Sequence, residues 1–238
     1  PNKELCIRLR DKLNTISPFE FKNVYSKSNQ IGFVMKYFYE FHTNPDVNSA
    51  IKFTLGMNSY SEYMNGLNSL YREKRINKCK FGKKMKFNDA YYPYLLNNEP
   101  VKNTIDMKKN IAITGPNASG KTTILKTTLL NIIFSQSFGF GFYSKGVLTP
   151  YNKIHCYLNI PDTSGRDSLF QAEARRCKEI LESLEDNKKH FCIFDELFSG
   201  TNPNEACASS YGFIKYLIKK NNIDFILTTH LLDLCKKI

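Results

Sequence analysis

The chain has 238 residues, of which 42% are hydrophobic and 24% are charged, and its formal net charge is +12. This length accommodates one large domain or two small ones around a hydrophobic core, and the composition is ordinary for a globular protein. The sequence has no apolar run long enough to span a bilayer and no signal-peptide pattern, so we expect no membrane association. Because the chain starts with Pro1 rather than Met, we expect a fragment of a longer protein.

The seven cysteines are odd in number and include no CxxC pair. Several lie inside apolar runs, as Cys192 does, and buried free thiols are the expected state of such residues. This pattern predicts an intracellular protein, cytoplasmic or nuclear, in a reducing compartment.

The positive charge is concentrated in the first part of the chain. Residues 1–87 hold 16 Lys/Arg against 7 Asp/Glu, whereas residues 88–238 hold 18 against 15. A dense basic patch can contact the phosphates of DNA, although a composition rich in Lys and Asn can also arise without selection for binding. The patch comprises Arg72, Lys74, Arg75, Lys78, Lys80, Lys83, Lys84 and Lys86.

Residues 1–87 are expected to be helical, because apolar side chains recur there at the spacing of one helix face. Pro18 and Asn44-Pro45 are expected to break the segments. We interpret the apolar stripes as packing faces. They consist of Ile31, Val34, Met35, Phe38 and Phe41, and of Tyr60, Tyr63, Met64, Leu67 and Leu70.

From about residue 88, strand-like runs alternate with amphipathic helical stretches. This alternation predicts an α/β domain over residues 88–238, with a mostly parallel sheet flanked by helices. Ligand sites of parallel sheets lie at the carboxyl ends of the strands, where the motifs of this chain occur. The expected strands are 111–114, 154–158, 191–194 and 225–228, and the expected helices run from about 121 to 135, 168 to 184 and 203 to 219.

The segment GPNASGKT follows the first of these strands and opens a helix, as the phosphate-binding P-loop pattern GxxxxGK[ST] requires. In such a loop, glycines let the backbone wrap around phosphates, and the N–H groups and helix N-terminus face the negative charge. Lys121 is expected to reach the β- and γ-phosphates of ATP, and the Thr122 hydroxyl to ligate Mg²⁺. The predicted nucleotide-binding residues are Gly115, Pro116, Asn117, Ala118, Ser119, Gly120, Lys121, Thr122 and Thr123.

Two carboxylates end the apolar run at 191–194, about 75 residues after the P-loop, as in a Walker B segment. Asp195 would hold Mg²⁺, directly or through water, and Glu196 would orient and deprotonate the attacking water. A simple helix-capping role at a loop is the alternative for these acids. The step Thr228-Thr229-His230 ends the last predicted strand, where the histidine can sense the γ-phosphate or polarise the water.

The runs TGPNASGKTT, FDELFSGTN and TTH, in this order, resemble the ATPase domain of the MutS family, whose members show TGPN-x-x-GKST, DE-x-x-x-GT and a TH pair. Residues 164–173 resemble the family's signature loop, a Gly followed by Ser-x-Phe-x-x-Glu, with one residue more between the Gly and the Ser. Residues 99–103 resemble its adenine-side segment, without an evident aromatic residue near Pro100 or Val101. The resemblance covers roughly residues 88–238, and residues 1–87 would match the family's lever and core region by position and helicity.

The resemblance implies an ABC-type P-loop ATPase that binds ATP and Mg²⁺ at a dimer interface and couples nucleotide state to DNA, with mismatched DNA and mismatch repair as one candidate. The dimer would be formed with a second copy or with a paired MutS-like subunit. Carried over, Asn103 would contact the nucleotide, and Ser168 would reach the partner's nucleotide. Gly200, Thr201 and Asn202 would lie at the interface. A capping role for Ser168 at the start of its helix is the alternative for that residue.

Two other hypotheses stay open. Another ABC-type ATPase, of the transporter or chromosome-maintenance type, is disfavoured because the chain has no LSGGQ segment. A nucleotide-locked DNA-binding scaffold without enzymatic activity is disfavoured by the presence of Lys121, Asp195 and Glu196. Measured ATP turnover separates an enzyme from a scaffold.

Overall fold

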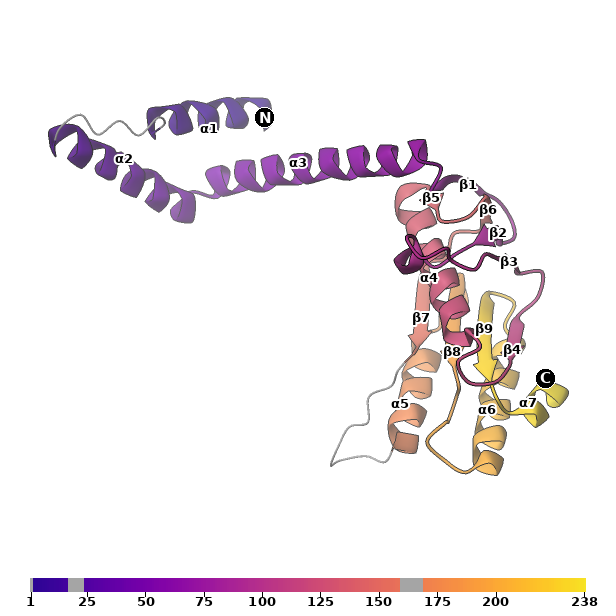
Figure 1. Ribbon diagram of the computed structural model, residues 1–238. Coiled ribbons are helices and arrows are strands. Elements are labelled where there is room, and N and C mark those ends of the chain that lie inside the picture. The colour runs from indigo at the N-terminus through magenta and orange to yellow at the C-terminus, as the bar shows by residue number, and fades with distance from the viewer. Residues whose placement is uncertain (1, 17–23, 159–168) are drawn as a thin grey trace. The chain divides into compact units, whose positions relative to one another are not determined.

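The computed structural model describes residues 2–16, 24–158 and 169–238 of the chain. The chain divides into two compact units, Pro1–Arg72 and Glu73–Ile238. The first unit consists of helices α1 (Asn2–Ile16), α2 (Val24–Thr43) and α3 (Pro45–Arg72), drawn in indigo and purple in Figure 1.

The break expected at Asn44-Pro45 is confirmed. Pro45 is the first residue of α3, where its missing N–H and fixed φ suit a helix start. The Asn44 side chain accepts a hydrogen bond from the N–H of Asp46 at 3.0 Å and thereby satisfies one of the free donors of the first turn. Pro18, the other expected break, lies outside the described residues.

The apolar stripes of the helical unit are mostly exposed in the described part of the chain. Leu67 is buried, whereas Met35 and Phe38 on α2 are 68% and 66% exposed, and Tyr60 on α3 is 61% exposed. Most residues of the two stripes are thus exposed within the described part of the chain, and their role as packing faces stays a prediction. Their helical spacing is confirmed, because the first stripe lies on α2 and the second on α3.

The expectation of helices through residue 87 is also wrong at its end. Helix α3 stops at Arg72, and β1 (Asn77–Phe81) and β2 (Lys86–Ala90) follow as strands. Met85 and Phe87 are buried on either side of the exposed Lys86. This alternation with period two is the signal of a half-buried strand, and it was hidden by the high lysine content.

The predicted parallel sheet is confirmed. It contains β4 (Ile111–Thr114), β7 (Lys153–Tyr157), β8 (His190–Asp195) and β9 (Ile223–Thr229), in the order β4-β9-β8-β7, and all three pairings are parallel. Strand β9, which ends in Thr228-Thr229, therefore lies between β4 and β8. Strand β4 precedes the glycine-rich loop, and β8 ends in Asp195. All four carboxyl ends meet at one edge, as Figure 1 allows the reader to follow.

A second, mixed sheet was not expected. Its strand order is β3-β2-β6-β1-β5, with β3 at Asn103–Asp106, β5 at Phe140–Gly141 and β6 at Lys145–Leu148. Its strands are only two to five residues long, and most of its pairings are antiparallel. A short 3-10 helix, η1 (Pro93–Leu95), lies between β2 and β3.

Helices cover both faces of the parallel sheet. They are α4 (Lys121–Phe138), α5 (Leu169–Glu182), α6 (Pro203–Ile218) and the short α7 (Leu232–Lys237). Along β8, Phe191 and Ile193 pack in one core cluster with residues of α4 and of the second sheet. The alternating Cys192 and Phe194 pack in another cluster with residues of α5 and α6. The carboxyl edge of the sheet is thus held by two cores, one on each side.

No helix in the described part of the chain is both long and apolar enough to cross a membrane. All seven cysteines are described, and all are free thiols. Burial raises the pKa of Cys177 and of Cys192 to about 12, so these two thiols stay protonated and pack as small apolar groups.

Candidate active site

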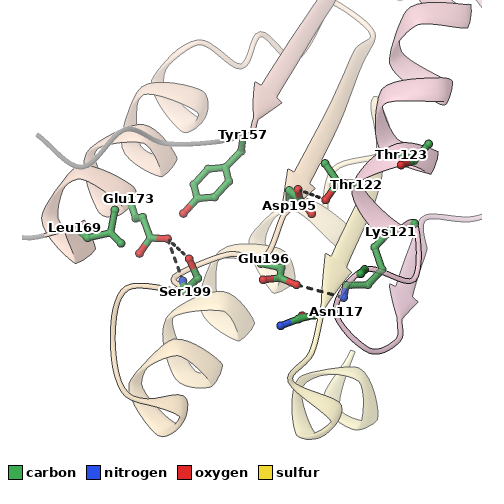
Figure 2. Close-up of a pocket in the computed structure, with 12 residues that line it drawn as sticks. Asn117, Lys121, Thr122, Thr123, Tyr157, Leu169, Glu173, Asp195, Glu196 and Ser199 are labelled. Atoms are coloured by element: carbon green, nitrogen blue, oxygen red, sulfur yellow. Dashed lines mark hydrogen bonds and ion pairs between the residues drawn. The ribbon is translucent and has the colours of Figure 1, made fainter. Parts of the chain in front are cut away.

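A cavity of about 510 Å³ opens at the carboxyl edge of the parallel sheet. It brings together the loop after β4, the start of α4, the end of β8 and the start of α5, which lie far apart in the sequence (Figure 2). The lining residues are Asn117, Ala118, Gly120, Lys121, Thr122, Thr123, Tyr157, Leu169, Glu173, Asp195, Glu196 and Ser199.

The glycine-rich loop turns tightly from β4 into α4. Gly120 is the N-cap of α4 at φ +91°, and Ala118 also has a left-handed φ of +61°. L-residues rarely adopt such values, so a glycine is required at the first position and strain is present at the second. At Gly115, an added Cβ would lie 3.0 Å from the Ser119 hydroxyl oxygen. The loop can therefore present its backbone closely to a ligand.

Lys121 is the first residue of α4, and its side chain folds back over the loop. The ammonium donates to the carbonyl oxygens of Gly115 at 2.9 Å and Pro116 at 3.1 Å. It also lies 3.4 Å from a carboxylate oxygen of Glu196. With only 7% of the residue exposed, this cation is held at the mouth of the loop, where an anion would be attracted most strongly.

Asp195 ends β8 and receives a hydroxyl on each of its two carboxylate oxygens. Thr122 Oγ1 donates to Oδ2 at 2.7 Å, and Thr228 Oγ1 donates to Oδ1. These threonines come from α4 and β9, so the carboxylate joins three elements of the sheet edge. The dashed line between Thr122 and Asp195 in Figure 2 marks the first of these bonds.

Glu196 follows directly, and its backbone turns the side chain towards Lys121. Its φ is +51°, and its N–H donates to the Thr228 carbonyl at 3.1 Å. The other Glu196 carboxylate oxygen lies 3.8 Å from His230 Nδ1. The three residues predicted to be catalytic, Lys121, Glu196 and His230, are thus brought together, with His230 half exposed at the rim.

A family model described as MutS domain V matches residues 111–238. The chain belongs to the MutS family. Its relatives include proteins named Endonuclease MutS2 from Staphylococcus aureus, with 28% identity over 193 residues, and from Thermus thermophilus, with 31% identity over 169 residues. These matches cover 76% and 68% of this chain but only 24% and 22% of the two relatives, so the chain spans less than a quarter of their length.

This MutS-family chain has a second cavity, with a volume of about 600 Å³, which the glycine-rich loop also lines. Tyr92, directly before η1, lines it together with Pro100 and Val101 from the segment before β3 and with Asn103, the first residue of β3. The cavity therefore has an aromatic lining residue, Tyr92, although none was evident next to Pro100 or Val101. Tyr92 lies eight residues before Pro100 in the sequence. Asn103 lines it as well, and Gly115, Pro116 and Ser119 form its border with the loop.

Beyond the predicted residues, the cavity near Asp195 contains a buried carboxylate on α5. Glu173 accepts hydrogen bonds from Ser199 and from the N–H of Gly200, in the loop after β8. Tyr157 projects from the end of β7 into the same cavity (Figure 2). Burial raises the pKa of the Tyr157 hydroxyl, and the neighbouring Glu173 charge acts in the same direction, so this hydroxyl stays protonated.

Ser168, Thr201 and Asn202 are the remaining residues that the family resemblance predicts to lie at an interface. Ser168, expected to reach a partner's nucleotide, lies outside the described residues, which resume at Leu169. Asn202 caps α6 by accepting the N–H of Glu205 at 3.0 Å, and Thr201 donates to the Glu205 carboxylate at 2.7 Å. Both side chains therefore have bonding partners within the chain, at the first turn of α6.

The donor set at Asp195 is suited to a small, hard cation. Carboxylate and hydroxyl oxygens are the ligands that Mg²⁺ prefers, and the ion usually takes one or two protein ligands together with substrate phosphates and water. Among the described residues, no group of three or more His, Cys, Asp or Glu side chains forms a cage for a metal ion. Thr122 and Asp195, beside the glycine-rich loop, are a donor set that fits an ion bound together with a ligand.

Proposed function

We propose that this chain binds ATP together with Mg²⁺ in the cavity at the sheet edge and hydrolyses it. The observation that carries the proposal is the pair of contacts Thr122–Asp195 and Lys121–Glu196, because they unite the glycine-rich loop with the two acids that end β8. In a P-loop NTPase, these are the groups that bind phosphate, hold the metal ion and activate water. The fold of residues 88–238 is accordingly proposed to be an ABC-type P-loop NTPase.

The phosphates would lie against the loop 115–120 and the N-terminus of α4. The first backbone N–H groups of a helix carry partial positive charge and have no acceptor within the helix itself, so they can donate to phosphate oxygens. Lys121 already turns over this loop and would exchange part of its bonding to loop carbonyls for the β- and γ-phosphates. Asn117 and Thr123 line the cavity beside it and would contact the same groups.

Thr122 and Asp195 would hold Mg²⁺. The bound ion would neutralise the charge on the phosphate oxygens, and both protein ligands already lie within hydrogen-bond distance of each other. Thr228, donating to the second oxygen of Asp195, would keep the carboxylate in place.

Glu196 would accept a proton from the water that attacks the γ-phosphorus. The new P–O bond forms as the bond to the β–γ bridging oxygen breaks, which releases phosphate and ADP. Lys121 would stabilise the charge on the transferred group, and His230, next to the other Glu196 oxygen, would sense the γ-phosphate or polarise the water.

The nucleobase would occupy the second cavity. Its apolar residues, Val101 and Pro100 among them, suit a flat ring, and the Tyr92 ring supplies an aromatic face. The Asn103 amide can donate to or accept from base or ribose groups. Because the glycine-rich loop borders both cavities, one ATP molecule can extend from the base site to the phosphate site.

We further propose that the nucleotide state is coupled to DNA in a dimer, formed with a second copy or a paired MutS-like subunit. Of the predicted region 1–87, the helical unit Pro1–Arg72 would correspond to the family's lever and core region. Family membership supports this proposal, and mismatched DNA in mismatch repair is one candidate substrate. The end of β1 and the turn to β2 supply a candidate DNA contact, since Lys80 in β1 and Lys83 and Lys84 in the turn are exposed.

Phosphate release from ATP, measured with the 238-residue chain in the presence of Mg²⁺ and after chelation, tests the ATPase proposal. An ATPase turns over ATP only with the metal ion present. A nucleotide-locked scaffold binds ATP under both conditions without releasing phosphate, and that result would reject the enzymatic proposal.

A further inference from the structure

A buried carboxylate on α5, that of Glu173, accepts hydrogen bonds from the loop that follows Glu196. Glu173 is only 2% exposed. One of its oxygens accepts the N–H and the hydroxyl of Ser199, at 3.0 and 3.2 Å, and the other accepts the N–H of Gly200 at 3.2 Å (Figure 2). Both carboxylate oxygens are therefore bonded to a segment that starts three residues after Glu196.

The backbone of this loop is strained, so its conformation requires stabilising contacts from other elements. Glu196 and Phe198 have left-handed φ values of +51° and +56°, which residues with a Cβ rarely adopt. Conformations of this kind persist only where the surroundings enforce them. The Glu173 bonds begin directly after the second strained residue, and the Phe198 N–H donates to the Tyr157 hydroxyl at 3.4 Å.

All three contacts of Glu173 with the loop are hydrogen-bond donors, and the Tyr157 hydroxyl on β7 interacts with the same carboxylate. An ionised carboxyl group only accepts hydrogen bonds, whereas a glutamine of the same shape would turn an NH₂ group towards one set of donors. Glu173 forms no ion pair with a cation in the part of the chain that the structure describes, so the loop donors, together with the Tyr157 hydroxyl, compensate for its burial.

Helix α5 and the loop also fit together closely. A Cβ added at Gly200 would lie 2.5 Å from Cγ of Leu169, which is one turn before Glu173 on α5. Besides its interaction with Tyr157, Glu173 bonds to this loop, whereas Lys121 bonds to the glycine-rich loop and Thr122 to Asp195. The anchoring of the loop is therefore separate from the phosphate-binding elements.

We infer that Glu173 is a positioning residue for ATP hydrolysis. By fixing Ser199 and Gly200, it keeps the turn at Glu196 in the conformation that directs its carboxylate towards Lys121 and the phosphate site. This inference rests on the proposed ATPase function and deepens it, because it assigns the Glu173 contacts to the hydrolytic step and not to nucleotide binding.

The test compares Glu173→Gln with Glu182→Gln in the 238-residue chain. Glu182 lies on the same helix with its side chain 66% exposed, so the control makes the same charge change outside the cavity. We expect Glu173→Gln to lower kcat about 10- to 100-fold, the range typical of a small displacement of a catalytic group. The calorimetric Kd for Mg-ATP should stay within about twofold of the original chain's value, because α4 is untouched. Glu182→Gln should match the original chain.

Two further variants keep the inference testable if Glu173→Gln does not fold. Ser199→Ala removes only the hydroxyl contact and should give a smaller loss of kcat with the same unchanged Kd. Glu173→Asp keeps the charge and should recover part of the activity lost in Glu173→Gln.

An unchanged kcat in Glu173→Gln, or a parallel loss of kcat, ATP affinity and melting temperature in all the variants, would overturn the inference. The proposed ATPase function fails by a different result, namely no ATP turnover by the unsubstituted chain.

Discussion

Replacing Lys121 with alanine is expected to weaken ATP binding by about 10- to 150-fold. The ammonium is nearly buried, bonds to the Gly115 and Pro116 carbonyls and lies 3.4 Å from Glu196, so it is already held where the terminal phosphates would lie. Hydrogen bonds to charged groups contribute about 1.5–3 kcal/mol. Since about 1.4 kcal/mol corresponds to a tenfold change in Kd, the expected range follows.

Isothermal titration calorimetry with Mg-ATP measures this loss directly. Lys126→Ala is the matched control, because Lys126 lies on the same helix, is only partly exposed and faces neither cavity among the described residues. A melting curve for each variant verifies that the chain is folded. If folded Lys121→Ala binds ATP with the affinity of the unsubstituted chain, the assignment of the glycine-rich loop as the phosphate site is wrong.

Three other predictions concern the base, the DNA and the dimer. Tyr92→Ala should weaken ATP binding about 2- to 10-fold, the equivalent of a lost aromatic contact, while Tyr92→Phe should not; equal affinities of all three chains would remove Tyr92 from the base site. Replacing Lys80, Lys83 and Lys84 with Gln should flatten the slope of log K against log salt for duplex DNA by about 1 to 3, and an unaffected slope would mean that the patch is only a solvated surface. Mixing Ser168→Ala chains with Lys121→Ala chains, each inactive alone, should partly restore ATPase activity, because one site of a mixed dimer then carries neither defect. Mixed dimers that form and stay inactive would contradict the role of Ser168 across the interface.

The parallel sheet was predictable because each of its central strands is a short, continuous apolar run. Strands buried on both faces have this appearance, and β8 contributes side chains to a core on either side. The loops at the carboxyl ends of these strands were predictable for a related reason. Within each loop, the glycine, lysine or acidic residues are contiguous in the sequence, so the type of site can be predicted from the sequence before the fold is known.

The second sheet and two of the cavity residues could not be obtained in this way. Strands of two to five residues carry too few side chains to establish a period, and the lysines around Met85 and Phe87 concealed the alternation that was present. Tyr92 and Glu173 depend on tertiary contacts. Glu173 meets the N–H groups of residues that lie 26 and 27 positions further along the chain, and its place in the signature-like segment did not indicate this partner.

The most direct test of ATP hydrolysis at this site is the behaviour of Glu196→Gln. Hydrolysis of ATP in a single turnover, and calorimetric ATP binding, would be measured on this variant and on the unsubstituted chain. Loss of a general base costs about 10²- to 10⁴-fold in rate, so hydrolysis should slow by that factor while ATP stays bound with similar affinity. A variant that hydrolyses ATP as fast as the unsubstituted chain would contradict the role of Glu196, and His230 would become the next candidate for the base.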